Sequence, residues 1–490
     1  MPRQPRGTRK RHKLPKPPNP TSVIPEEFEK PVDKDLRVDL LSMVVLLLKY
    51  LTPVLCETVF KKHQTKERER KWAFYDVCMF WVAMIVRHPS GIQAGVSETR
   101  KRGRVRDKLW PRVRTSARAF HTKATGLGYH LFQAVYDAFT ARILPQTSGA
   151  YASWLGQLRK DFPEIIIVDG SRLDAVCRKI GILRKVTAKV LPGCVTVFYD
   201  LFRGISRQVL FFPDAAEGEF PRGLPGLTWI AKGALLMGDR LYSSVQYFLL
   251  LADLNLYGLF RKNGTLKIRV LEVISRKQIK GTRCFLEDAR VEVGCGVGQP
   301  TVTLRLTQFR SPRGILELLT NVLDPQKLAP ETAVALYGMR WTIERMFLDL
   351  KETLDLRTLH SSHPNLVAQQ IYAAAIVHTA FRIAQARIAK KAKVRPEQIS
   401  PAKLFPKLAQ AADDYCVAHI YVMRLQELNP GINVPGLGVL SSAYTSLGSI
   451  LVEHRNPHRR RRRFCAGRKT WKSFAHVPGG PTFLKSLSVV

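Results

Sequence analysis

Two aspartates of this sequence follow short aliphatic runs. Asp169 ends the run Glu164-Ile-Ile-Ile-Val-Asp169, and Asp239 ends the run Ala234-Leu-Leu-Met-Gly-Asp239. A run of aliphatic residues without polar alternation is typical of a strand that is covered on both faces. An aspartate after a strand is also a common turn residue, so either one alone has two interpretations. Taken as a pair on adjacent strands, they predict two carboxylates that converge at one edge of a sheet.

A third carboxylate, Glu344, lies in a helix that we expect to span Thr332 to Leu356. At about 100° per residue, Tyr337, Arg340 and Lys351 lie within about 40° of Glu344 on one face of that helix. The alternative interpretation is an exposed face held by Arg–Glu pairs four residues apart. The buried side of this helix is predicted to be formed by its apolar residues Ile343, Phe347, Leu350 and Leu354.

Three converging carboxylates would suit phosphoryl transfer on DNA. Carboxylate oxygens are the ligands that Mg²⁺ prefers, and two such ions about 4 Å apart can activate water or a 3′-hydroxyl and neutralise the leaving oxygen. We therefore predict that Asp169, Asp239 and Glu344 are catalytic and bind two divalent metal ions, Mg²⁺ or Mn²⁺. The phosphates of a DNA strand along the helix would then meet Arg340 and Lys351.

The charge of the chain also points to a polyanion. Lys and Arg number 78 against 39 Asp and Glu, which leaves a formal charge of +39 over 490 residues. Each basic side chain that contacts a phosphate releases a counterion, so nucleic acid binding should weaken steeply with salt. A basic surface on a protein with another function is the alternative that charge alone leaves open.

Other composition features exclude several classes of protein. The eight cysteines are scattered and form no C-x-x-C pair, so neither a zinc site nor a disulfide framework is indicated. The basic, proline-rich start lacks the apolar segment of a secretory signal, and the apolar run Leu40 to Leu48 is shorter than the roughly 20 residues of a membrane span. We expect a cytoplasmic, nucleoid-associated protein of a prokaryotic cell with no membrane partner.

Changes in composition and in the spacing of apolar residues along the sequence suggest four regions. Residues 1–30 combine Pro with Arg and Lys and are predicted to be a disordered basic arm. Apolar spacings of three and four residues in Asp39 to Phe60, Trp72 to Val86 and Tyr129 to Ile143 predict helices there and indicate an N-terminal helical DNA-binding domain over 31–155. Short β-branched runs with interleaved helices follow over 156–390, with a β-rich insertion at 263–325. Residues 391–490 are predicted to form a C-terminal helical region with a basic tail that contains Arg459 to Arg463.

The order of elements in 156–390 indicates an α/β fold. Three strands are expected first, at 164–169, 194–202 and 207–212, and then a helix at 227–232. Another strand at 234–239, a helix at 243–254 and a fifth strand at 257–261 follow. This order is that of the ribonuclease H-like fold, a mixed sheet with helices on its faces.

At four positions the helix around Glu344 resembles a known signature. The spacing Y-x2-R-x3-E-x6-K of Tyr337, Arg340, Glu344 and Lys351 is similar to the YREK signature of the insertion-sequence DDE transposases of the IS-four type. Val168-Asp-Gly-Ser171 resembles the first-aspartate turn of that family, and Gly238-Asp-Arg-Leu-Tyr242 resembles the second. The segment Leu319-Thr-Asn-Val322 resembles the strand before its glutamate helix. The similarity covers roughly residues 36 to 390.

This resemblance implies a cut-and-paste transposase. Hydrolysis would free a 3′-hydroxyl at each transposon end, and the hydroxyl would then attack target DNA. By the resemblance, Tyr337, Arg340 and Lys351 hold the backbone of the transposon end. The partners implied are terminal inverted repeats and target DNA, both double-stranded, with two protein copies paired on the DNA.

Three further residues near the motifs are weaker candidates for DNA contact. Trp341 follows the motif arginine, and it could contact DNA or pack in the core. Arg240 and Tyr242 could contact phosphate or brace Asp239.

Two alternative functions stay open from the sequence. The first is a metal-dependent nuclease of the same fold that cuts without strand transfer. The second is a DNA-binding protein that keeps the fold without catalysis, although all three carboxylates and the whole motif helix are present here.

Overall fold

The structure is a computed structural model, and it describes most of the chain. The described residues are 33–63, 71–101, 109–172, 193–214, 223–279, 282–294, 296, 298, 300–312, 314–412 and 444–452. The predicted basic arm and the run Arg459 to Arg463 lie outside them. The cysteines that the structure describes, Cys56, Cys78, Cys194 and Cys284, are buried thiols.

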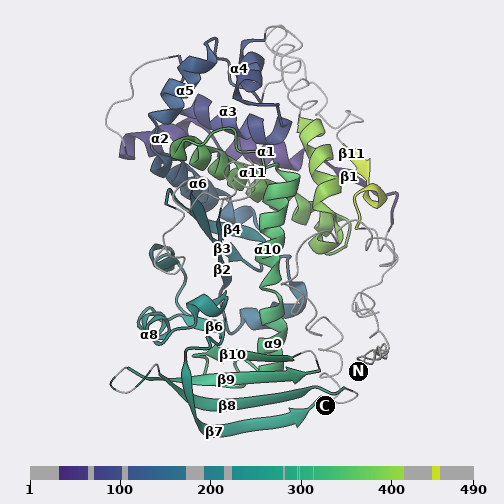
Figure 1. The fold of residues 1–490 in the computed structure, drawn as a ribbon. Helices are drawn as coiled ribbons and strands as arrows, with labels where there is room; N and C mark the ends of the chain where they lie inside the picture. Colours follow the sequence, from purple (N-terminus) through teal and green to yellow (C-terminus); the bar gives the residue numbers. More distant parts are fainter. Residues whose placement is uncertain are drawn as a thin grey trace, which may run out of the picture.

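The first part of the described chain is helical, as its apolar spacing predicts. Pro53 lacks the backbone N–H that a continuous helix needs, and the predicted helical segment Asp39 to Phe60 is accordingly divided in two. The helices and their bounds are α1 (Ser42–Tyr50), α2 (Pro53–His63), α3 (Phe74–Arg87), α4 (Ile92–Arg100), α5 (Ala117–Thr125) and α6 (Tyr129–Ile143). They gather at one end of the molecule (Figure 1).

A mixed sheet forms the centre of the molecule. Its first five strands are β2 (Ile165–Arg172), β3 (Cys194–Asp200), β4 (Ile205–Phe212), β5 (Leu235–Gly238) and β6 (Tyr257–Arg261). In space they are ordered β4-β3-β2-β5-β6. Strands β2, β5 and β6 are parallel, β3 is antiparallel to β2, and β4 is antiparallel to β3, so β3 alone of these five strands runs in the opposite direction. Helix α8 (Val245–Asp253) follows β5 as predicted. The helix predicted at 227–232 is wrong, because the chain forms only a 3₁₀ turn at Leu224–Leu227 around Pro225.

The segment predicted as a β-rich insertion is all-β but continues the central sheet. Its four antiparallel strands are β7 (Lys267–Gln278), β8 (Phe285–Gly294), β9 (Val302–Ser311) and β10 (Gly314–Thr320). Strand β10 pairs with β6, so the nine strands form one sheet in the order β4-β3-β2-β5-β6-β10-β9-β8-β7. Figure 1 shows β7 to β9 at the end of the molecule opposite the helices.

The predicted helix over 332–356 is broken into three pieces. Helix α9 (Pro330–Gly338) and helix α10 (Trp341–Leu348) are followed by the π-helical turn η10 (Asp349–Thr353). At the break, Arg340 and Ile343 donate backbone hydrogen bonds to residues three positions earlier, at 3.0 and 3.2 Å. The tighter turn at the break and the wider turn after it replace the regular 3.6-residue spacing. A single face defined by that spacing therefore does not run along the whole segment.

Helix α11 (Pro364–Lys391) packs against the N-terminal helices and the sheet. Almost all of its residues are buried, and its apolar side chains belong to one core cluster with α1, α3, α6, β2 and β3. The N-terminal helices thus share their core with the segment predicted as catalytic, and the domain boundaries stay predictions. After α11 the chain is helical again at 401–412, and β11 (Tyr444–Ser446) pairs with β1 (Arg37–Asp39).

Within the described residues, no single helix has both the length and the hydropathy of a membrane span. Helices α1 and α2 reach that hydropathy only when taken together, and they are bent by 42°.

Candidate active site at the edge of strands β2 and β5

Asp169 and Asp239 lie side by side because of the strand register. Ile165, Ile166 and Ile167 of β2 pair with Leu235, Leu236 and Met237 of the parallel strand β5. The same register, continued for two residues, places Asp169 opposite Asp239. Side chains alternate between the faces of a strand, so each aspartate shares its face with the residue two positions earlier. Those residues, Ile167 and Met237, belong to the core cluster that includes α10 and α11.

The backbone around Asp239 is fixed by a tight turn. The Asp239 carboxylate accepts a hydrogen bond of 2.7 Å from the Leu241 N–H and caps the short 3₁₀ helix Arg240–Tyr242. The Tyr242 ring packs on Gly238, where an added Cβ would come within 2.8 Å of the ring and within 3.2 Å of Val168. Glycine at 238 therefore lets Tyr242 support the turn that carries the aspartate.

Glu344 reaches the same edge from helix α10, and Arg340 joins it to Asp169. The Arg340 guanidinium donates a hydrogen bond of 2.8 Å to Glu344 Oε1, and its other terminal nitrogen lies 3.6 Å from Asp169 Oδ2. All three side chains are partly buried, with exposures of 16% for Arg340, 18% for Asp169 and 35% for Glu344. Burial opposes the charge of Arg340, but Tyr337, Asp169 and Glu344 outweigh it and raise its pKa above the usual value.

Tyr337 extends this cluster toward Asp239. Burial raises the pKa of the Tyr337 phenol to about 12, while Arg340 lowers it and Asp239 raises it further. The phenol therefore lies within electrostatic reach of both the arginine and the second aspartate. Tyr337 and Arg340 are thus linked to the three predicted carboxylates, Arg340 by contact with Asp169 and Glu344 and Tyr337 by its electrostatic interaction with Asp239.

These side chains do not fit a cation as they stand. Carboxylates are the right donors for Mg²⁺, yet in the described parts of the chain no three acidic, histidine or cysteine side chains are grouped closely enough to hold a metal ion. The Arg340 guanidinium is in contact with two of the three carboxylates. Asp239 is engaged by its own turn.

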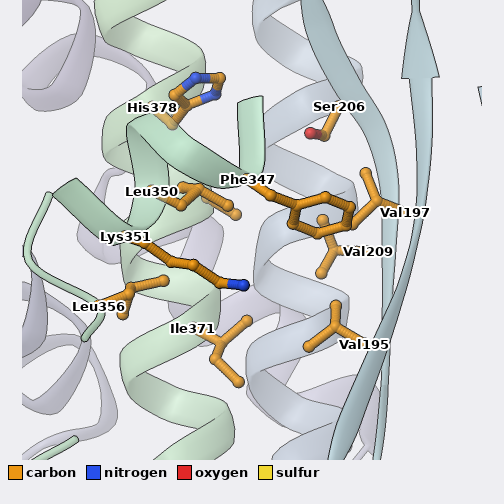
Figure 2. Close-up of a pocket in the computed structure, with 11 residues that line it drawn as sticks. Val195, Val197, Ser206, Val209, Phe347, Leu350, Lys351, Leu356, Ile371 and His378 are labelled. Atoms are coloured by element: carbon orange, nitrogen blue, oxygen red, sulfur yellow. The ribbon is translucent and has the colours of Figure 1, made fainter. Parts of the chain in front are cut away.

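Lys351 lies in the wall of an apolar pocket. The pocket extends between β3, β4, α10 and α11, and Figure 2 shows the Lys351 side chain reaching across it toward Val209. Strand residue Val197, which lines the pocket, pairs with Asp169 in the sheet. Lys351 lies in the π-helical turn, where the regular 3.6-residue spacing behind its predicted shared face with Glu344 does not apply. The pocket is lined by Val195, Val197, Ser206, Val209, Phe347, Leu350, Lys351, Leu356, Ile371, Ala375 and His378.

The three weaker candidates divide into exposed and buried residues. Trp341 is 41% exposed, so the alternative of a core tryptophan is wrong. Arg240 is exposed beside Asp239. Tyr242 is completely buried, so its predicted DNA contact is wrong and its packing supports the alternative of a brace for Asp239. The predicted apolar side of the helix holds for Ile343 and Leu354, which are buried.

The sequence interpretation missed a polar network on the apolar helix α11. Buried Arg382 donates to the Gly204 carbonyl at 3.0 Å and to Gln385 at 2.8 Å, and its guanidinium lies 4.1 Å from the centre of the Tyr151 ring. Arg382 also acts electrostatically on Asp349, in the π-turn after α10, whose pKa burial raises to about 6. The spacing of His378, Arg382 and Gln385 on an otherwise apolar helix is the signal that could have revealed this network.

A second arginine–aspartate pair fixes the approach to helix α9. Arg305 on β9 and Asp288 on β8 are 0% and 1% exposed and lie 3.1 Å apart. Arg305 also donates to the backbone carbonyls of Val322 and Leu328. Thr307 donates to the same Asp288 oxygen. The pair therefore ties the four-stranded segment to the chain that leads into α9.

Known proteins resemble the part of the chain that holds these residues. Residues 161–380 match the family model described as the transposase DDE domain. A protein of Sinorhizobium fredii (strain NBRC 101917 / NGR234) named "Putative transposase y4zB" is 28% identical over 159 residues. That alignment covers 32% of this chain and 44% of the relative, so the chain spans less than half of the relative's length.

Among solved structures, the chain is similar to the piggyBac transposase in a synaptic complex with hairpin DNA. The two share 11% identity with a TM-score of 0.37, over 81% of this chain and 85% of that chain. The region of residues 161–380, which contains Asp169, Asp239 and Glu344, is thus similar to a transposase DDE domain.

Proposed function

We propose that this protein is a DNA transposase with a ribonuclease H-like core, of the IS-four type with a YREK helix. The observation that carries the proposal is that Arg340 contacts both Asp169 and Glu344, while the register of β2 and β5 carries Asp239 beside Asp169. These residues come from two adjacent parallel strands and a helix far along the chain. Such an arrangement is typical of a site that acts on a phosphate ester.

The strand order supports the proposed fold. Three antiparallel strands, β2 to β4, are followed by β5 and β6, which are parallel to β2. Asp169 lies within β2, beyond the residues that pair with β5, and Asp239 directly follows β5. Catalytic residues at the carboxyl ends of neighbouring strands are a general feature of α/β enzymes.

The three carboxylates would hold the two divalent ions of the proposed reaction once Arg340 has left them. When bound, such ions activate the attacking oxygen and neutralise the leaving oxygen. Residues of the chain would position the DNA and the carboxylates. Arg340 and Tyr337 would hold the backbone of the transposon end, and Tyr242 would keep Asp239 in place through Gly238.

The outer face of helix α10 is a suitable surface for DNA. Trp341, Arg345 and Leu348 are exposed at a spacing that places them along one side of the helix. A tryptophan and an arginine beside a carboxylate site can meet a nucleotide ring and a phosphate. The charge of +39 supplies the general attraction. We propose that two copies pair the terminal inverted repeats before cutting.

A strand-transfer assay tests this function directly. The full chain is incubated with Mg²⁺, a supercoiled target plasmid and a labelled duplex that ends in a free 3′-hydroxyl. The duplex carries the inverted repeat that flanks the coding sequence. A transposase joins the label to the plasmid, whereas a nuclease of the same fold only cuts it. A DNA-binding protein without catalysis would shift the duplex without either product.

A further inference from the structure

We infer that Arg340 closes the carboxylate site against cations until a DNA phosphate draws it away. This inference rests on the proposed function. The guanidinium lies 2.8 Å from Glu344 and 3.6 Å from Asp169. No three potential ligand side chains of the described residues are arranged to hold a metal ion in this conformation. Arg340 therefore occupies the position in which a cation would neutralise both carboxylates.

Arg340 and a divalent cation should compete for Asp169 and Glu344, because both are positively charged. A divalent ion that binds Asp169 Oδ2 and Glu344 Oε1 must displace the arginine, because these are the two oxygens that Arg340 contacts. Displacing the arginine breaks its charge-assisted hydrogen bond to Glu344, which should weaken cation binding by about tenfold or more.

The displaced arginine needs a new partner. Arg340 is only 16% exposed, and a buried guanidinium without an anion is unfavourable. A phosphate of a bound DNA strand is the natural acceptor, because the planar guanidinium pairs with phosphate through two hydrogen bonds. DNA and cation would then assist each other, with Arg340 moving from the carboxylates to the phosphate.

Cation affinity in the absence of DNA tests the inference. Mn²⁺ is titrated into the full-length protein and followed by electron paramagnetic resonance, for the natural protein and for Arg340→Gln. We expect Arg340→Gln to bind Mn²⁺ about tenfold more tightly. Equal affinities of the two proteins would overturn the inference.

The matched control is Arg345→Gln, which removes the same charge from the same helix. The Arg345 side chain is exposed. Its loss should change Mn²⁺ affinity by no more than about twofold, as expected for a charge screened by solvent. An equal gain in Arg345→Gln would mean that net charge, and not the Arg340 contact, controls cation binding, and would overturn the inference.

A second measurement needs no metal. DNA affinity is compared in EDTA for Glu344→Gln, Arg340→Gln and the double variant, with circular dichroism as the check of folding. Glu344→Gln should tighten DNA binding several-fold, because it releases Arg340, and this gain should vanish in the Arg340→Gln background. A gain that persists in the double variant reflects repulsion by Glu344 alone and contradicts the inference.

These experiments separate the two proposals. If Mn²⁺ binding depends on Asp169 and Glu344 but not on Arg340, the proposed function survives and the role of Arg340 fails. If neither protein binds Mn²⁺ with or without DNA, both proposals fail.

Discussion

Arg305 and Arg340 each contact aspartate, yet their surroundings differ. Arg305 and Asp288 are enclosed between strands β8 and β9, and two backbone carbonyls complete the partners of the arginine. Arg340 lies at the break between α9 and α10, partly exposed, and contacts two carboxylates of the candidate site. The first pair keeps its partners as long as the fold persists, whereas the second is accessible to solvent and can exchange them.

The Arg305–Asp288 pair is therefore an ion pair that stabilises the fold, whereas the Arg340 contacts belong to the candidate active site. Burial lowers the pKa of Arg305 and raises the pKa of Asp288, so desolvation works against both charges. Removing one member leaves the other buried without a partner. At Arg340 burial also opposes the positive charge, but the nearby Tyr337, Asp169 and Glu344 outweigh burial and raise the pKa of the arginine. Substitutions at the two arginines should therefore affect different properties.

The largest effect is expected at the carboxylates that Arg340 contacts. Asp169→Ala or Glu344→Ala should abolish Mg²⁺-dependent nicking of end DNA, because each removes a proposed cation ligand. Binding of end DNA should stay largely intact in a mobility-shift assay. Nicking that persists in either variant would remove that residue from the site.

The enclosed pair should control stability instead. Arg305→Ala should lower the free energy of unfolding by about 3 to 5 kcal/mol, because Asp288 keeps its buried charge without the arginine that neutralises it. Urea denaturation followed by circular dichroism measures the change. The matched control is Arg290→Ala. Arg290 pairs with Arg305 across the sheet and forms an exposed ion pair with Glu272, which should be worth less than about 1 kcal/mol. Similar decreases in the free energy of unfolding for the two variants would mean that the enclosed pair stabilises the protein no more than the exposed pair does.

A carboxyl group near the break should make stability depend on pH. Burial raises the pKa of Asp349 from 3.8 to about 6, although Arg382 and Arg345 lower it. The folded protein therefore holds this proton more tightly than the unfolded chain. The resulting stability is complete below about pH 4 and is lost as pH rises through about 6.

Asp349→Asn should flatten this part of the pH profile. Unfolding free energies measured between pH 4 and 7 should fall less steeply in the variant, with a gain of about 1 to 2 kcal/mol at pH 7. Asp137, whose pKa burial raises to about 7, contributes equally to both profiles. The control is Asp253→Asn, which makes the same substitution at an exposed position. Identical profiles for natural protein and Asp349→Asn would refute the buried-acid interpretation.

The smallest effect concerns the salt dependence of DNA binding. Arg340→Ala should weaken end binding and reduce the slope of log affinity against log salt by about 1, because one phosphate contact is lost. Fluorescence anisotropy over a range of salt concentrations measures the slope. Arg276→Ala removes an exposed charge on the outermost strand β7 and should change the slope less. An unaltered slope for Arg340→Ala would make this arginine structural.

The sheet edge could be predicted from sequence because its signals are local. Aliphatic runs before Asp169 and Asp239 marked the strands, and the mixed sheet contains both as parallel neighbours. The strand Tyr257–Arg261 and the helix Tyr129–Ile143 have their expected bounds. In each case, the faces of the element that are buried determine the spacing of apolar residues along the sequence, and this spacing can be recognised without the structure.

The helix that carries Glu344 was predicted less well, since its geometry depends on contacts distant in sequence. No proline or glycine pair marks the break at Arg340, and the helical period fails there and again at the π-turn. Lys351 consequently faces a pocket formed by β3, β4 and α11. The enclosed pair Asp288–Arg305 could not be foreseen either, because neither strand alone shows that its charged residue meets the other.

The most direct test of the account is where cations bind in the DNA complex. Crystals of the full chain with end DNA are grown in Mn²⁺, and the metal is located by anomalous diffraction. We predict manganese peaks among Asp169, Asp239 and Glu344, with the Arg340 guanidinium on a DNA phosphate. Carboxylates that stay on Arg340, with no peak between them while DNA is bound, would contradict the proposed site.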